Sequence, residues 1–220
     1  MPIGLQVFRD TNTLQIDSDV LTVSFLGKFT ISGWTRGSTI YRAALSLPKA
    51  TKFVLFGETA ASSSIAVRSV VLTASSADYE FWSNTADSVV CYCFGDAPVV
   101  PSRCGLQLFD SAGNLTFDSN NKILRISAVY ETSSDTQSFS LPVAIGRTYA
   151  CGISNYDTRY RQNQVGQNLA FMVMIRSVRV SGGTVTSGLL ANQGPPTTSP
   201  PANSPIGPMP VIMVADVTGF

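Results

Sequence analysis

The sequence contains no histidine, and only 13% of its 220 residues are charged, about half the ~25% common in globular proteins. Without histidine there is no Ser-His-Asp or Cys-His nucleophile system, no imidazole metal ligand and no ordinary proton shuttle near neutral pH. The three glutamates and eleven aspartates show no pair marked out by its setting as a general acid and base. We therefore expect a protein that is not an enzyme and that uses no cofactor.

Long apolar runs are also missing. The longest, near residues 169–175, falls far short of the ~20 residues that a membrane-spanning helix needs. Residues 1–4 show neither the basic segment nor the apolar stretch of a signal peptide. The net charge of +1 gives no field that would attract nucleic acid. We expect synthesis in a cytoplasm, no membrane insertion and no nucleic-acid partner.

Cysteine is scarce, and its spacing is uninformative. Cys91, Cys93, Cys104 and Cys151 lie outside any CxxC or paired-ligand pattern. Free cysteine behaves as a small apolar residue, so we expect buried thiols and no metal site. A disulfide from Cys91 or Cys93 to Cys104 is the alternative.

The residues that are present follow the pattern of β-strands. Apolar side chains recur at every second position in residues 4–8 and 14–18, with turn-forming residues between them. This pattern predicts a β-hairpin, and an alternating run at 21–25 predicts a third strand. Further strands are expected at 65–73, 89–94 and 169–180, the last followed by a Gly182-Gly183 turn. No stretch keeps a helical period of 3.6 residues.

The hairpin pattern occurs twice. Residues 4–18 and 105–119, offset by 101 positions, are identical at seven of fifteen places, namely Gly, Leu, Gln, Phe, Leu, Asp and Ser. A Ser-Leu-Pro landmark follows both copies, at residues 46–48 and 140–142. These matches predict an internal duplication. Asp17 and Asp118 recur at the hairpin ends, where a short carboxylate is expected to cap a turn rather than to catalyse.

The predicted fold is all-β, with two tandem antiparallel units of β-sandwich or jelly-roll type and a C-terminal arm. We place the first unit at residues 1–97, the second at 104–192 and the proline-rich arm at 193–220. The arm ends in an apolar decamer that would be wasted on a disordered tail. It either folds back onto its own second unit or adds a strand to a neighbouring subunit. In the latter case Val211, Ile212, Val214 and Phe220 would contact the partner.

The segment 155–164 is the richest mixture of aromatic, arginine and amide side chains in the chain. Rigid aromatic rings and forked guanidinium groups anchor interfaces and also stack on sugars. Tyr156, Arg159, Tyr160 and Arg161 are therefore candidate partner-binding residues, with an ordinary solvated loop as the alternative.

The motif itself gives a functional expectation. The sequence GLQLFDSAGNLTFDS at 105–119, and its more divergent copy at 4–18, resemble the N-terminal hairpin of small tail proteins from long-tailed, non-contractile bacteriophages. The first copy departs from that motif at Arg9, Asn12 and Gln15. The resemblance implies a structural protein of the virion, in the tail tip or baseplate, made in the host cytoplasm. Its implied partners are copies of itself in a ring or trimer, other tail or baseplate proteins, and tail fibres. A carbohydrate-binding adhesin that recognises host-surface glycan is the alternative.

Overall fold

The computed structural model describes the backbone of residues 6–8, 14–17, 22–96, 101–141, 144–154, 158–165, 168–197 and 210–220. Side chains are described for the same residues except 6–8, 14–17, 160–165, 168–171 and 193–197. All regular structure in these segments is β-strand, as the alternating sequence pattern predicts. Within them, no helix is long and apolar enough to cross a membrane.

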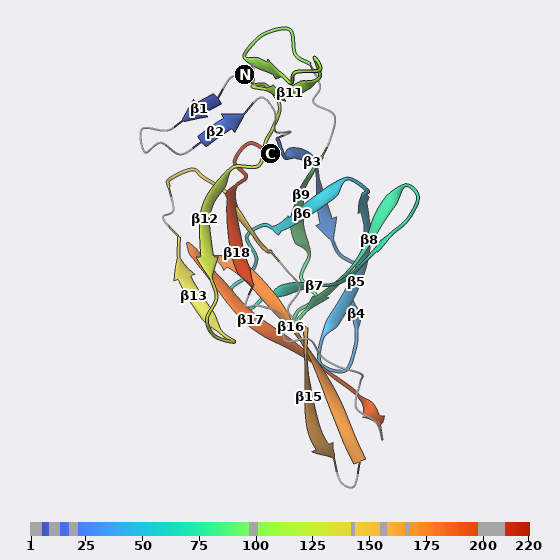
Figure 1. Cartoon of the computed structure of the whole chain (residues 1–220). Helices are drawn as coiled ribbons and strands as arrows, with labels where there is room; N and C mark the ends of the chain where they lie inside the picture. The colour runs from blue at the N-terminus through green and yellow to red at the C-terminus, as the bar shows by residue number, and fades with distance from the viewer. Residues whose placement is uncertain are drawn as a thin grey trace.

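Most of the strands belong to two antiparallel sheets (Figure 1). The first sheet has six strands, in the order β12 (Ile126–Glu131), β18 (Val211–Asp216), β14 (Tyr149–Ile153), β6 (Thr51–Phe56), β9 (Val89–Gly95) and β3 (Ser24–Ile31).

The second sheet has eight strands. Seven follow one another as β13 (Gln137–Ser140), β17 (Thr184–Thr197), β16 (Asn168–Ser181), β7 (Ile65–Leu72), β8 (Ser76–Ser83), β5 (Tyr41–Pro48) and β4 (Thr35–Arg36). The eighth, β15 (Thr158–Val165), pairs with β16.

The two sheets share one main core, because each contributes alternate side chains to it. Cys91 and Cys93 of β9 point into this core, whereas Tyr92 and Phe94 join a second apolar cluster. That second cluster also contains Val23 from before β3 and the C-terminal Phe220. The middle strands of the six-stranded sheet are therefore buried on both faces, which explains why they read as continuous apolar runs.

The strand order has an internal two-fold relationship. From one end to the middle, the six-stranded sheet runs β3-β9-β6, which all belong to the first half of the chain. From the other end to the middle it runs β12-β18-β14, which are the equivalent strands of the second half. The larger sheet likewise runs β5-β8-β7 and β13-β17-β16. The halves join through antiparallel contacts, Cys151 with Phe56 and Val178 with Ile65.

The equivalence extends to individual residues. The β3 ladder with β9 shifts register between Phe25 and Gly27, and the β12 ladder with β18 shifts between Ile126 and Ala128, 101 positions later (126 − 25 and 128 − 27). Directly after β6, Gly57 donates its N–H to Val90 O at 2.8 Å, and directly after β14, Ser154 donates its N–H to Val211 O at 2.9 Å. These matched registers support the duplication inferred from the sequence.

The two halves of the chain, predicted as the units 1–97 and 104–192, are joined rather than separate. Both sheets and the main core draw strands from each half. The segments before β3 and β12 also pair with each other, since Leu124 donates its N–H to Val23 O at 2.9 Å. Joining edge to edge gives the two halves one shared core, which is larger than a unit of about 90 residues would have alone.

The predicted arm at 193–220 is also placed differently. Strand β17 runs on to Thr197, past the expected boundary, and residues 198–209 lie outside the described part. Strand β18 then lies between β12 and β14 in the chain's own sheet. It occupies in the second half the position that β9 occupies in the first, so of the two expectations for the apolar end the structure shows the fold-back onto its own unit.

The second half carries one large addition. Strands β16 and β17 have 14 residues each, against eight in the equivalent β7 and β8. Their extra length, with β15 paired alongside, forms a three-stranded finger that projects from the body (Figure 1).

Candidate functional site

The duplicated motif forms two small hairpins outside the main sheets. The first pairs β1 (Gln6–Phe8) with β2 (Leu14–Asp17), and the second pairs β10 (Gln107–Phe109) with β11 (Leu115–Asp118). Both lie at the same end of the molecule (Figure 1). Their registers match at the offset of 101, since Gln6 pairs with Asp17 and Gln107 with Asp118. Both also shift register at the step before the phenylalanine.

Asp118 organises the second hairpin from within. Its carboxylate is buried and accepts hydrogen bonds from the Gln107 amide (2.9 Å), the Ser102 N–H (2.7 Å) and the Asn120 N–H (2.8 Å). The Ser102 hydroxyl adds a fourth at 3.0 Å. The Gln107 amide and the two backbone donors hold the pKa of Asp118 well below its usual range. This arrangement supports the expected capping role, because every partner here is a donor that fixes the chain.

The remaining polar positions of the motif close the two ends of the hairpin. Gly105 has φ +104°, and a Cβ there would collide with the Ser119 hydroxyl. That hydroxyl accepts the Leu106 N–H at 3.0 Å. At the other end, Asp110 accepts the Asn114 N–H at 2.8 Å, and Gly113 adopts the left-handed conformation, with φ +82°. The Asn114 amide also lowers the pKa of Asp110.

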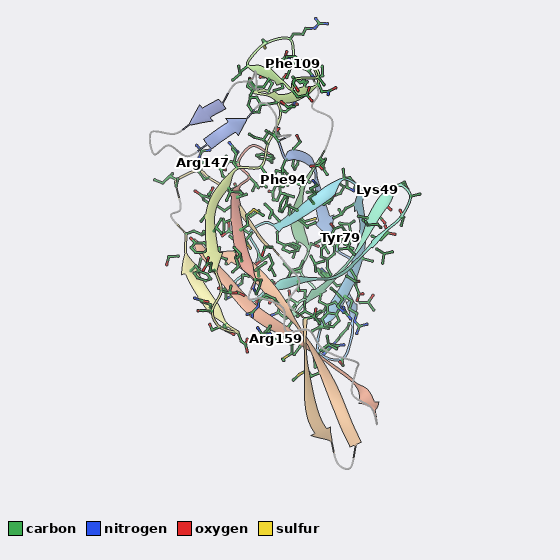
Figure 2. All side chains as sticks on the ribbon, in the orientation of Figure 1. Lys49, Tyr79, Phe94, Phe109, Arg147 and Arg159 are labelled. Carbon is green, nitrogen blue, oxygen red and sulfur yellow. The ribbon has the colours of Figure 1, made fainter. Side chains whose placement is uncertain are left out.

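Two apolar residues of the motif are exposed instead of fixing the hairpin's geometry. The side chain of Leu106 is 45% exposed and that of Phe109 is 49% exposed. Phe109 stands at the outer end of the molecule in Figure 2. Leucine and phenylalanine also occupy the corresponding positions 5 and 8 of the first copy. The second hairpin therefore presents repeated apolar residues to the outside, on a frame fixed by repeated polar ones.

A shallow hollow of about 330 Å³ adjoins this hairpin. Lys122 and Arg125 lie over the ring of Phe220, with 5.3 Å and 5.2 Å to its centroid. Phe220 also packs against Phe25 and Phe94, with ring centroids 5.0 Å and 5.6 Å away. The C-terminal residue thus forms part of the floor below the hairpin end rather than a free tail.

The structure separates the four candidates in segment 155–164. Tyr156 lies outside the described residues, and for Tyr160 and Arg161 only the backbone in β15 is described. Arg159 donates to Asp135 Oδ1 at 2.5 Å, and its side chain is 19% exposed. Arg159 therefore fastens β15 to the turn before β13, which corrects the prediction that it is available to a partner.

Asp135 also lies 3.8 Å from the buried guanidinium of Arg176. Arg176 donates to the carbonyl oxygens of Ser134 (3.0 Å) and Asp135 (2.8 Å). It lines a cavity of about 180 Å³ beside Phe56 and Tyr79. Carbonyl groups and one carboxylate surround this charge, as burial of an arginine requires.

The predicted contact residues at the C-terminus are part of the chain's own core. Ile212 and Val214 are fully buried between the sheets, and Val211 pairs with Glu131 of β12. This burial corrects the prediction of partner contact for Ile212 and Val214, whereas Val211 and Phe220 are partly buried. The apolar pattern correctly predicted a strand, but it did not indicate which chain's sheet the strand joins.

The cysteines are free thiols in the structure. Cys91, Cys93 and Cys151 are buried, as predicted, whereas Cys104 is exposed, and the alternative disulfide is not formed. The Cys91 contact and burial raise the pKa of Cys93, and burial raises the pKa of Cys151. Among the described residues, no group of three His, Cys, Asp or Glu side chains is arranged to hold a metal ion.

Two surfaces were not singled out by sequence reasoning. One is the apolar pair Leu106 and Phe109, which the repetition itself could have indicated. The other is the outer edge of β12, where Ile126 and Val129 are exposed. Comparisons with protein-family models, with curated proteins and with solved structures found no match to this chain.

Proposed function

We propose that this chain is a structural protein of a bacteriophage virion, located in the tail tip or baseplate, where it joins the tail to fibres or supports host contact. The support is the duplicated hairpin, whose sequence resembles the N-terminal motif of small tail proteins. The chain would be made in the host cytoplasm and incorporated during assembly.

One observation carries this proposal. Within the repeated motif, Gln107, Asp118 and Ser119 make hydrogen bonds in the second hairpin and Gly105 leaves room for the Ser119 hydroxyl, whereas Leu106 and Phe109 are exposed. An apolar side chain exposed to solvent does not stabilise the fold, so stability does not explain why these residues are repeated. A surface that docks against a partner does explain it. A small hairpin with a rigid polar frame and exposed apolar residues suits docking into another virion protein.

The internal two-fold relationship adds to this. It brings both hairpins to one end of the molecule (Figure 1), so that one chain offers two related docking elements. A connector that joins successive components of a tail needs more than one attachment point. Copies of the chain in a symmetric ring or trimer, other baseplate proteins and tail fibres are the partners that this role requires.

The proposal is tested by location. Mass spectrometry of virions purified from the phage or prophage that encodes this chain should detect it at a fixed ratio to the major tail protein. Cryo-electron microscopy of the same particles should place it at the tail tip. Particles that lack the chain and still infect normally would refute the role.

A second candidate function is a carbohydrate-binding adhesin. It is favoured by the projecting finger, because β15 carries the backbone of Tyr160 and Arg161 at the side of the sandwich that projects from the body (Figure 1). Replacing Tyr160 and Arg161 with alanine should abolish binding to host cells or to purified surface glycan without changing the melting temperature. Unaltered adsorption would leave the structural role as the only candidate.

A further inference from the structure

The two outer edges of the sandwich differ, although the internal two-fold relationship makes them equivalent. At the first edge, β3 carries Lys28, which is exposed, and the other sheet ends in the two-residue strand β4 with Arg36. Short edge strands and cationic side chains are devices that prevent one sheet from pairing with another. The first edge is protected in both sheets.

The second edge carries no cationic side chain on its strands. Strand β12 contains no lysine, arginine or proline, and neither does β13, which ends the other sheet at the same side (Figure 1). At the position equivalent to Lys28, 101 residues later, stands Val129, which is 58% exposed, and Ile126 before it is 55% exposed. Within the described segments, no strand pairs with the outer side of β12.

The hydrogen-bonding phase of β12 identifies which backbone groups are available. Thr132 donates its N–H to Pro210 O at 3.4 Å, so its backbone groups face β18. In an antiparallel ladder the N–H and C=O groups of every second residue point to the same neighbour, so those of residues two and four positions earlier also face β18. The N–H and C=O groups of Val129 and Glu131 consequently point away from the sheet. They form an unused row along the outer side of the strand.

This row matches a second copy of itself. In an antiparallel arrangement about a two-fold axis, Val129 lies opposite the partner's Val129, and Ser127 lies opposite the partner's Glu131. The apolar residues meet, and the only charged residue of the strand faces a hydroxyl rather than a like charge. The halves of one chain are already joined edge to edge in this antiparallel manner, through β6 with β14 and β7 with β16.

We propose that two copies of this chain dimerise through their β12 edges, with Val129 at the two-fold axis, to form a continuous twelve-stranded sheet (two sheets of six). The adjacent β13 edges would enlarge the contact. The dimer uses a surface distinct from the hairpins, and it does not depend on the proposed place in a virion.

The first test compares equivalent positions. Val129→Lys gives β12 the residue that β3 carries at the same register, and Lys28→Val is its matched control. By analytical ultracentrifugation across a range of concentrations, we expect dimers for the wild type and Lys28→Val and monomers for Val129→Lys. Both variants should keep the wild-type circular dichroism spectrum and a cooperative melting transition. A monomeric wild type, or a Val129→Lys variant that still dimerises, would overturn the proposal.

A second test reads the register directly. In a Cys104→Ser background, which removes the exposed thiol, Val129→Cys should form an intermolecular disulfide with oxidised glutathione, and a reductant should reverse it. Lys28→Cys in the same background should remain uncrosslinked. Crosslinking of both variants alike, or of Lys28→Cys alone, would contradict the register and indicate another mode of association. A dimer that is absent from virions would refute the virion role alone, and a monomer found in virions would refute the dimer alone.

Discussion

Gln107 and Asp118 are direct cross-strand partners, and the Gln107 amide donates to Asp118 Oδ2 at 2.9 Å. Gln6 and Asp17 pair in the same register in the first hairpin. In the second hairpin, this one interaction gives a structural reason for the pairing of a glutamine with an aspartate. The polar part of the repeated motif specifies the geometry of a hairpin.

Acid should weaken this hairpin in a predictable way. Because the folded state lowers the pKa of Asp118, the ionised carboxylate contributes stability above its unfolded pKa of about 3.9, and that contribution is lost as the pH falls further. We expect Asp118→Asn to lower the melting temperature at pH 7, and the difference from wild type to shrink below about pH 4.

Thermal melts between pH 2.5 and 7 measure this difference. Asp96→Asn is the control, since Asp96 contacts only the exposed Lys52 among the ion pairs of the described residues and should change little. A deficit of Asp118→Asn that stays constant over the whole range would show that the charge is not responsible.

The C-terminal strand should be essential for stability. Ile212 is fully buried in β18, whereas Ile145 is fully exposed, so the two isoleucines form a matched pair. We expect Ile212→Ala to reduce the free energy of unfolding by about 2–5 kcal/mol and Ile145→Ala by less than about 0.5 kcal/mol, both measured by urea denaturation. A chain ending at Gln193, which lacks β18, should not unfold cooperatively. Wild-type stability of that shorter chain would contradict the placement of β18.

The junction between the two halves should be sensitive to one added methyl group. A Cβ at Gly152 of β14 would lie 2.6 Å from Leu55 Cδ2 and 2.8 Å from Val54 O. We expect Gly152→Ala to destabilise the protein by about 1–3 kcal/mol. Gly188→Ala is the control, because its Cβ would meet only Ser177 Oγ at 3.7 Å. Equal unfolding midpoints for the two variants would mean that β6 and β14 are not packed as described.

The exposed apolar residues of the second hairpin should matter for assembly rather than for folding. We expect the double variant Leu106→Ser/Phe109→Ser to melt within a few degrees of wild type but to be lost from purified virions. Val71→Ser/Leu72→Ser is the control, since these residues are 62% and 67% exposed but lie in β7, outside the hairpins. Quantitative mass spectrometry of particles complemented with each variant provides the measurement. Normal incorporation of the hairpin variant would remove its proposed docking role.

Local features were predicted well because they depend on neighbouring residues. The apolar sequence pattern located β7, β9, β16 and β18, and the Gly182-Gly183 turn has the positive φ angles that such a turn needs. Strand β3 was less well placed. The expected run at 21–25 overlaps it only from Ser24, because Thr22 and Val23 belong to the irregular segment that meets Leu124.

Long-range relationships were not accessible in the same way. Arg159 looks like a contact residue in the sequence, and only the fold brings it to Asp135, 24 positions away. The apolar end was equally consistent with a neighbour's sheet, because main-chain hydrogen bonds are the same whichever chain supplies them.

The sequence by itself determined the all-β character, the two hairpins and their equivalence at an offset of 101 residues, since strand period and turn chemistry are local properties. Tertiary structure alone decided that the halves share both sheets, that β18 completes the second half, and that the strands bearing Lys28 and Val129 become the two outer edges of one sheet. These outcomes depend on which strands bury one another's apolar faces. That choice is made by the packing of the whole chain, and no short stretch of residues records it.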